Sequence, residues 1–186
     1  GTNRREDGYG GSLEKRGRFV REIIEACRDA VGPEFPISLR WSQWKQQDYS
    51  ARLVSSPQEL ERFLLPLSEA GVDLFHCSQR RFWEPEFEGS DLNLAGWTRR
   101  ITGKPTVTVG SVSLDADFIP APGEKSFREA EPASLDELLR RLEAQEFDLV
   151  AVGRAQIANP DWAQRVAAGS TEGLRPFTRD MLMRLD

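Results

Sequence analysis

Short apolar runs alternate with longer amphipathic stretches along this chain of 186 residues. Four of the runs are rich in β-forming residues and cover 36–40, 72–77, 105–110 and 149–153. Each is nearly continuous in apolar side chains, as in strands that are covered on both faces. Their spacing is that of one strand–helix unit, so the pattern predicts a parallel α/β fold.

Helical periodicity and capping signals predict helices around and between these strands. Apolar residues recur every three or four positions over 12–31. Ser56–Glu59 and Ser134–Glu137 have the sequence of capping boxes, which predicts that helices begin there. Asn159 and Pro160 predict a cap for a last short helix.

We predict a single domain over 1–186, with a helix, then four strands and a helix after most of them. This order fits either a small open parallel sheet or half of an eight-stranded (β/α) barrel, which normally needs about 250 residues. The segment 118–133 follows the third predicted strand and is rich in proline, glycine and charge. Its position predicts a loop that serves as a lid.

Composition narrows the class of protein. A net charge of −5 argues against a nucleic-acid-binding surface. No apolar run has the length of a membrane span, and the N-terminus lacks the apolar core of a signal peptide, so we expect no membrane partner and a cytoplasmic location. Two cysteines and one histidine are too few for a disulfide framework or a zinc site, so no metal is expected.

The last two predicted strands both end in glycine, which allows a close approach of backbone to ligand. Ser111 follows Gly110, and Arg154, a planar fork of donors, follows Gly153. The loops after the last two strands of a (β/α) barrel frequently form a phosphate site. The four residues are therefore predicted to converge on one phosphate. The alternative is that the glycines only permit tight turns and Arg154 pairs with a surface carboxylate.

Other candidates have weaker signals. Arg40 ends the first predicted strand, where it suits either a carbonyl or anionic heterocycle, or a salt bridge at the rim. Trp41 and Trp44 suit a pocket lining, although packing in the core or rim is more frequent. His76 could act as a general acid or base, but no partner lies at a telling spacing, so a structural role is favoured. We predict that 80–85 forms a solvated, self-paired loop.

Several motifs, in this order, resemble those of the Old Yellow Enzyme family of flavin-dependent oxidoreductases. They are NRREDGYGGSLEKR at 3–16, LRWS at 39–42, KPTVTVG at 104–110, VGR at 152–154 and NPDW at 159–162. The resemblance implies an FMN-binding (β/α)₈ barrel that takes hydride from NADH or NADPH. It also implies reduction of an activated C=C bond, typically in an α,β-unsaturated carbonyl compound.

The resemblance assigns roles by position. Arg40 would lie against the N1/O2 edge of the flavin and stabilise negative charge on the reduced ring. Gly110, Ser111, Gly153 and Arg154 would hold the FMN phosphate. In the family, the substrate-binding His/Asn or His/His pair and the tyrosine proton donor precede the region matched here. No catalytic residue is therefore assigned to this chain.

The family's layout makes these strands five to eight, the C-terminal half of the barrel. A half barrel has two open edges and an apolar inner face, which proteins normally pair or cover. The expected partners are a small-molecule substrate and either the N-terminal barrel half or a second copy of the chain. The alternative function is a non-catalytic half barrel that binds FMN or another phosphate ligand weakly, or only assembles.

Overall fold

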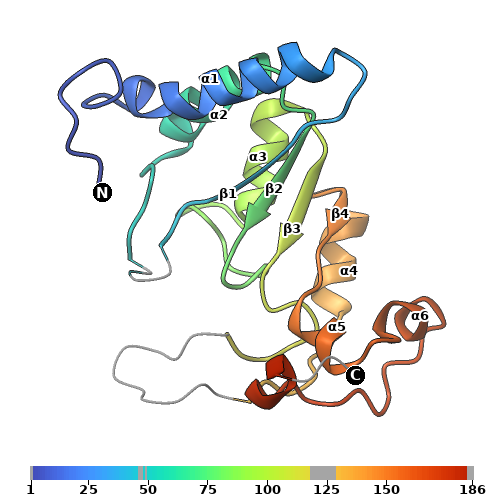
Figure 1. Cartoon of the computed structure of the whole chain (residues 1–186). Coiled ribbons are helices and arrows are strands. Elements are labelled where there is room, and N and C mark those ends of the chain that lie inside the picture. Colours follow the sequence, from blue (N-terminus) through green and yellow to red (C-terminus); the bar gives the residue numbers. More distant parts are fainter. Residues whose placement is uncertain (1, 46–47, 49, 118–128, 184–186) are drawn as a thin grey trace.

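A four-stranded parallel sheet forms the centre of the fold in a computed structural model that describes residues 2–45, 48, 50–117 and 129–183 (Figure 1). The strands are β1 (Ser38–Ser42), β2 (Leu74–Ser78), β3 (Thr106–Val109) and β4 (Leu149–Val150). Spatial order follows chain order, and all three neighbouring pairs are parallel. The sequence prediction of a four-stranded parallel α/β fold is confirmed.

A helix precedes each strand. The elements are α1 (Leu13–Val31), α2 (Pro57–Glu69), α3 (Leu94–Thr102) and α4 (Asp136–Glu143), followed after β4 by α5 (Arg154–Ala158), α6 (Trp162–Ala167) and the 3₁₀ helix η1 (Arg179–Met183). The sequence pattern did not predict α3, which is short and contains Gly96 near its start. Its N-cap is Asn93, whose side chain accepts a hydrogen bond from the Gly96 N–H at 2.9 Å. Within the described ranges, no helix combines the length and apolar character needed to cross a membrane.

The predicted capping signals have different outcomes. At α2, the Ser56 hydroxyl accepts from the Glu59 N–H, and the Glu59 carboxylate accepts from the Ser55 N–H, which confirms a capping box shifted by one residue. At α4, the Ser134 hydroxyl accepts from the Asp136 N–H at 3.0 Å. The carboxylate of Glu137 does not complete that box, because it binds arginines of its own helix.

The predicted cap at Asn159 is wrong. The helix α6 begins at Trp162, and no side chain caps it. Asn159 is 3% exposed, and its side chain accepts from the Arg175 N–H at 2.8 Å and donates to the Arg175 carbonyl at 3.1 Å. A buried amide satisfies its donor and acceptor best where another backbone segment offers both partners. Asn159 therefore holds the C-terminal segment against the end of α5.

The two faces of the sheet differ. On β3, Thr106 and Thr108 are buried, whereas Val107 is only partly buried. The open face continues to β4, where Leu149 is aligned with Val107 and is 52% exposed. At β3 and β4 the open face thus carries aliphatic side chains. Aliphatic side chains on this face are expected for the inner face of a partial (β/α) barrel, because side chains fill the interior of the closed barrel.

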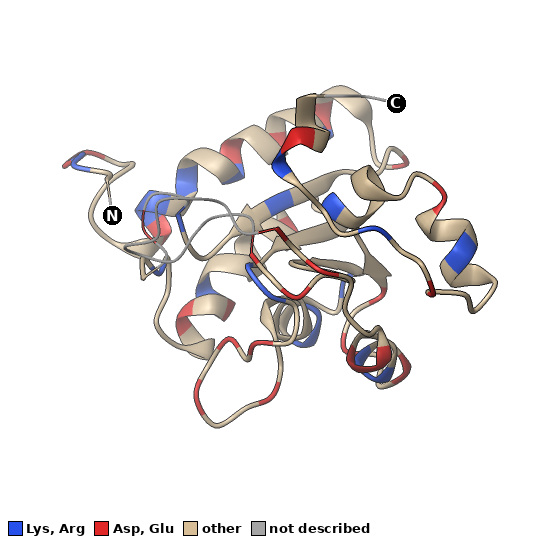
Figure 2. Ribbon diagram, turned by 90° about the horizontal axis from the view of Figure 1, so that it is seen from below, with Lys and Arg blue, Asp and Glu red and all other residues tan. Residues whose placement is uncertain are grey.

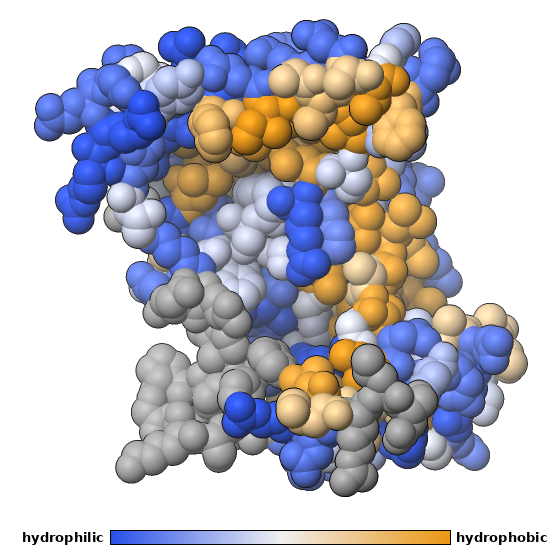
Figure 3. All heavy atoms as spheres, viewed as in Figure 1, coloured by the Kyte–Doolittle hydropathy of each residue, from blue (hydrophilic) through white to orange (hydrophobic). Residues whose placement is uncertain are grey.

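A further apolar surface lies along α1. Phe19 and Ile23 on this helix, and Phe35 in the connection to β1, are exposed by 64%, 46% and 60%. Figure 3 shows apolar side chains forming a band along this helix. In the ribbon view of Figure 2, acidic and basic positions are interspersed along the chain. The apolar band therefore marks the α1 side of the molecule as the side that favours apolar contact.

A hydrogen-bonded clamp joins the starts of β1 and β2. Asp73, just before β2, accepts a hydrogen bond from the Ile37 N–H at 2.8 Å and forms an ion pair with Arg28 of α1. The Ile37 N–H, together with Arg28, lowers the pKa of the Asp73 carboxyl. Arg28 also donates to the Gly71 carbonyl at 2.6 Å. One helix residue thus fixes two strand starts.

The same clamp recurs two helix–strand units further along. Asp148, just before β4, accepts from the Thr106 N–H at 2.9 Å and from Arg99 of α3 at 3.1 Å. Arg99 also donates to the Gln145 carbonyl at 2.7 Å. The segments from α1 to β2 and from α3 to β4 are therefore built on one repeated arrangement of helix arginine, strand-start aspartate and turn carbonyl.

The two cysteines are expected to react very differently with thiol reagents. Cys77 is fully buried on the helix-covered face of β2, and burial raises its pKa to about 12. Cys27 lies exposed on α1. Because the thiolate is the reactive form, titration with a chromogenic disulfide at pH 8 should modify one thiol per native chain and two in denaturant. Two rapid thiols in the native state would contradict this packing of β2.

Candidate functional site

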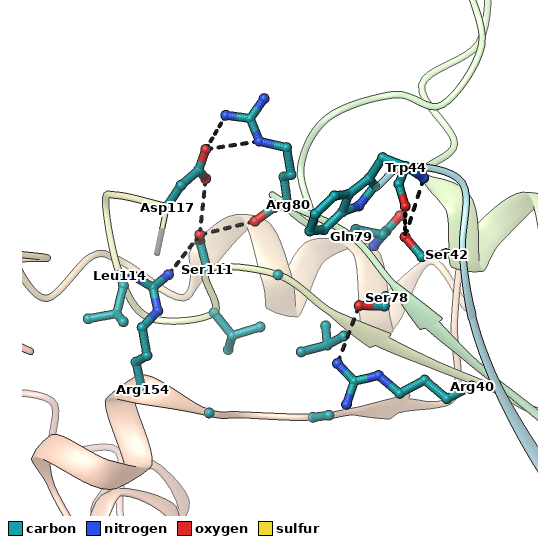
Figure 4. A pocket seen from close by; sticks show the side chains of 15 residues that line it. Arg40, Ser42, Trp44, Ser78, Gln79, Arg80, Ser111, Leu114, Asp117 and Arg154 are labelled. Carbon is teal, nitrogen blue, oxygen red and sulfur yellow. Dashed lines mark hydrogen bonds and ion pairs between the residues drawn. The ribbon is translucent and has the colours of Figure 1, made fainter. Parts of the chain in front are cut away.

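A cavity of about 450 Å³ opens at the carboxyl ends of the strands (Figure 4). Its volume lies within the range of small-molecule sites, roughly 300–1,000 Å³. All four strands or the segments that follow them contribute to its lining, which consists of Arg40, Ser42, Trp44, Ser78, Gln79, Arg80, Val109, Gly110, Ser111, Val112, Leu114, Asp117, Ala151, Gly153 and Arg154. The five residues predicted from sequence to bind a cofactor are all in this list.

The ends of β3 and β4 meet in this cavity. Arg154 donates through its terminal nitrogen to the Ser111 hydroxyl at 3.2 Å and to the Ala116 carbonyl at 2.7 Å. Its guanidinium carbon also lies 5.7 Å from the centre of the Phe177 ring. Arg154 is thus held with its fork of donors in the cavity, next to the hydroxyl that the sequence predicts to act with it.

The two glycines at these strand ends differ in their surroundings. Gly110 has φ +145°, and an added Cβ would lie 2.7 Å from the Gln79 carbonyl oxygen and 3.0 Å from the Arg80 carbonyl carbon. The loop after β2 crosses this point, and the Phe82 N–H donates to the Gly110 carbonyl at 3.1 Å. At Gly153, an added Cβ would meet no atom within 4 Å. Gly110 is required by the fold, whereas Gly153 leaves open space beside the cavity.

Substitution by alanine should separate these two roles. Gly110→Ala is expected to lower the free energy of unfolding by about 2 kcal/mol, because the new methyl meets backbone and the positive φ is strained. Gly153→Ala meets no protein atom and should change it by less than about 0.5 kcal/mol. Urea unfolding of both variants provides the comparison. Equal losses of stability would refute this distinction.

Arg40 lies in the middle of β1, not at the end where the sequence pattern placed it, because the strand runs two residues further. It is aligned with His76 of β2 and donates to the Ser78 hydroxyl at 3.3 Å. Its guanidinium therefore reaches the cavity along the open face of the sheet. Burial, and then the positive charge of Arg40, lowers the pKa of His76, so its imidazole is neutral at pH 7.

The two tryptophans after Arg40 have different positions. Trp41 is 8% exposed and packs against Phe63 of α2, with ring centres 5.7 Å apart. Trp44 instead lines the cavity, with the Ser42 hydroxyl accepting from its backbone N–H at 3.3 Å. Alternation along the strand explains the difference in part, since successive side chains of a strand point to opposite faces.

Sequence reasoning missed a second group of charged residues in the cavity. Arg80 binds one Asp117 oxygen through Nε at 3.1 Å and through a terminal nitrogen at 2.5 Å. Arg81 reaches the other Asp117 oxygen at 3.1 Å, and the Ser111 hydroxyl lies 3.5 Å from that oxygen. The Asp117 side chain is only 9% exposed. These contacts join the loop after β2 to the predicted phosphate site.

The predicted solvated loop over 80–85 is therefore partly wrong. Arg81 and Glu84 do pair with each other at 2.6 Å, as predicted. However, Phe82 is 3% exposed and Arg80 faces the cavity, because this loop packs against the end of β3. Most of the predicted lid, 118–133, lies outside the described residues. Of its described part, Ala130 forms a bridge with Phe177.

Comparison with known proteins places these features in a family. Residues 1–124 match the model of the NADH:flavin oxidoreductase / NADH oxidase family. The chain is 32% identical to an NADH oxidase of Thermoanaerobacter brockii over 94% of its own length and 24% of that protein's. It is 29% identical to enoate reductase 1 of Kluyveromyces lactis, covering 90% of the chain and 40% of the relative.

Solved structures show the same fold. A structure of morphinone reductase in complex with tetrahydroNAD superposes with a TM-score of 0.67 at 23% identity, over 97% of this chain and 41% of that one. The Old Yellow Enzyme homologue from Zymomonas mobilis gives a TM-score of 0.67 at 19% identity and is covered to 44%. The four strands are therefore a partial (β/α) barrel, and the chain spans less than half the length of these relatives.

Proposed function

Because the chain belongs to the NADH:flavin oxidoreductase / NADH oxidase family, whose members use FMN with NADH or NADPH, we propose that the cavity binds FMN. The observation that carries this proposal is the meeting of five residues from three strands, Arg40, Gly110, Ser111, Gly153 and Arg154, in one cavity. All five are predicted from the sequence to bind the cofactor. The proposed reaction is reduction of the activated C=C bond of an α,β-unsaturated carbonyl compound.

The described residues fit this cofactor. Arg154 donates to the Ser111 hydroxyl at 3.2 Å, so its fork of donors lies beside that hydroxyl, an arrangement that suits a phosphate group. The open space beside Gly153 leaves room for a ligand next to this strand end. Arg40 supplies a cation further along the open face of the sheet, where it would lie at the electron-rich edge of the flavin ring. The cavity thus has a phosphate end and a ring end.

FMN, when bound, supplies the hydride chemistry, taking hydride from the nicotinamide and passing it to the substrate. The chain's own contribution is positional and electrostatic. Arg154 and Ser111 anchor one end of the ligand, and Arg40 presents positive charge at the other. Burial and the adjacent Arg40 lower the pKa of His76, which favours the uncharged imidazole beside Arg40 in the sheet. We assign the substrate-binding and proton-donating groups to the remainder of a complete barrel.

A titration of the purified chain with FMN tests this function. The expected result is saturable binding. An absorbance band at about 450 nm, which belongs to the flavin itself, should be retained after gel filtration. Oxidation of NADPH in the presence of cyclohexenone then tests catalysis. Binding without turnover would favour a non-catalytic FMN-binding module, and the absence of any flavin binding would reject the proposed function.

We further propose that the barrel is completed by another (β/α) half, either the N-terminal half or a second copy. The aliphatic open face around Val107 and Leu149 and the exposed apolar band on α1 support this proposal. Light scattering after gel filtration measures the assembly. A monodisperse, soluble monomer of the 186 residues, with no affinity for an N-terminal half, would count against it.

A further inference from the structure

The carboxylate of Asp117 lies inside the proposed phosphate site. Its oxygens bind Arg80 at 2.5 Å and Arg81 at 3.1 Å, and one of them lies 3.5 Å from the Ser111 hydroxyl. The same hydroxyl accepts from Arg154 at 3.2 Å. Donors from the ends of three neighbouring strands therefore converge around one internal carboxylate (Figure 4).

We propose that the Asp117 carboxylate is an internal anion that competes with the ligand phosphate. When the phosphate displaces Asp117, Arg80 becomes an additional phosphate-binding residue. The inference rests on the proposed FMN function for the identity of the ligand. It adds to the arginines of the site an acidic residue that sets the affinity for the phosphate. It also extends the site from two strand ends to three.

Charge makes simultaneous occupancy unfavourable. A phosphate monoester carries nearly two negative charges at neutral pH. Held by the Ser111 hydroxyl, it would stand within a few ångströms of the Asp117 carboxylate, and two like charges at about 4 Å repel by several kcal/mol near a protein surface. Asp117 is the only carboxylate among the described lining residues, whereas the lining has three arginines. Displacement of Asp117 replaces this repulsion with attraction to Arg80.

The backbone of Arg80 is held in place by contacts that do not depend on Asp117. Its carbonyl accepts from the Ser111 hydroxyl at 3.1 Å, and its backbone packs onto Gly110 without room for a Cβ. The Phe82 N–H bonds the Gly110 carbonyl at 3.1 Å from the same loop. These backbone contacts do not involve Asp117, so its release leaves the Arg80 backbone anchored beside Ser111, with the guanidinium within reach of a phosphate there.

Isothermal titration of the full chain with FMN, riboflavin and inorganic phosphate tests the inference. Asp117→Asn removes the competing charge at nearly constant size. FMN should then bind about tenfold more tightly, because the free energy of a hydrogen bond to a charged group corresponds to a change in affinity of about that size. Riboflavin, which lacks the phosphate, should bind unchanged. In an Arg80→Gln background the gain should disappear. Asp115→Asn is the matched control, because its Oδ1 still accepts from the Glu131 N–H at 2.9 Å.

The outcomes separate the inference from the function on which it rests. Weaker FMN binding by Asp117→Asn would show that the carboxylate positions Arg80, and an equal gain for riboflavin would show an effect unrelated to phosphate; either overturns the inference. If no flavin binds to any variant, the proposed function fails. The affinity for inorganic phosphate is then the deciding measurement. Tighter phosphate binding by Asp117→Asn alone supports an internal competitor, and unchanged phosphate binding overturns the inference.

Discussion

Arg154→Ala should weaken FMN binding by roughly 30- to 100-fold, because it removes charged donors from the proposed phosphate end of the cavity. The loss follows from its position, with a guanidinium nitrogen 3.2 Å from the Ser111 hydroxyl and 2.7 Å from the Ala116 carbonyl. Fluorescence quenching of FMN on titration with protein measures it. Riboflavin affinity should fall much less, since its contacts lie at the ring end.

Two further variants isolate the phosphate contact. Arg154→Lys keeps the charge but loses the planar fork, so its affinity should lie between those of the wild type and Arg154→Ala. Arg62→Ala removes an exposed arginine of α2 that pairs with Glu14, and it should leave FMN binding unchanged. Thermal unfolding of each variant identifies any loss caused by misfolding. Equal affinity of wild type and Arg154→Ala for FMN would remove Arg154 from the site.

Arg141→Met should be the most destabilising substitution considered, lowering the free energy of unfolding by about 3–5 kcal/mol, as expected for breaking a buried ion pair. Arg141 of α4 is 4% exposed and binds both oxygens of Glu146, at 2.8 and 3.0 Å. It also donates to the carbonyls of Asp91 and Trp83 in the loop after β2. Methionine fills similar space but leaves a buried carboxylate and two carbonyls without this donor.

The neighbouring residue provides the control. Arg140 is 60% exposed and pairs with Glu137 on the same helix, so Arg140→Met should leave the free energy of unfolding almost unchanged. Urea unfolding monitored by circular dichroism gives both values. A combined Arg141→Met and Glu146→Leu variant should recover part of the loss, because an apolar pair replaces the unpaired charge. Similar destabilisation by the two arginine substitutions would contradict the buried network.

The sheet and much of the cavity could be predicted from the sequence because both depend on the positions of apolar runs. Continuous apolar runs predict buried parallel strands, and the carboxyl ends of such strands meet at one edge. Residues that follow the last two strands, such as Ser111 and Arg154, were therefore expected to be neighbours. Arg40 was expected at the same edge, although its exact position was wrong, because apolar runs do not define strand ends to within two residues.

Asp117 and Arg80 could not be predicted in this way. Their contact depends on the path of 111–117, where Ser111 and Ser113 have positive φ values of 49° and 62°. Non-glycine residues seldom adopt that conformation, so no local preference indicates it. The loop after β2 approaches Gly110 through a long-range contact, which local sequence does not indicate. A glycine at a strand end is consistent with the close approach of either a ligand or another segment of the chain.

The two arginine–aspartate clamps lie at the amino ends of the strands, opposite the cavity. Asp73 with Arg28 and Asp148 with Arg99 fix the strand starts without using any residue of the cavity lining. The two clamps thus stabilise the fold from the end of the strands opposite the cavity. Variation in the loops at the cavity can change substrate preference while strand alignment is preserved, so this architecture favours evolutionary diversification of one scaffold toward new chemistry.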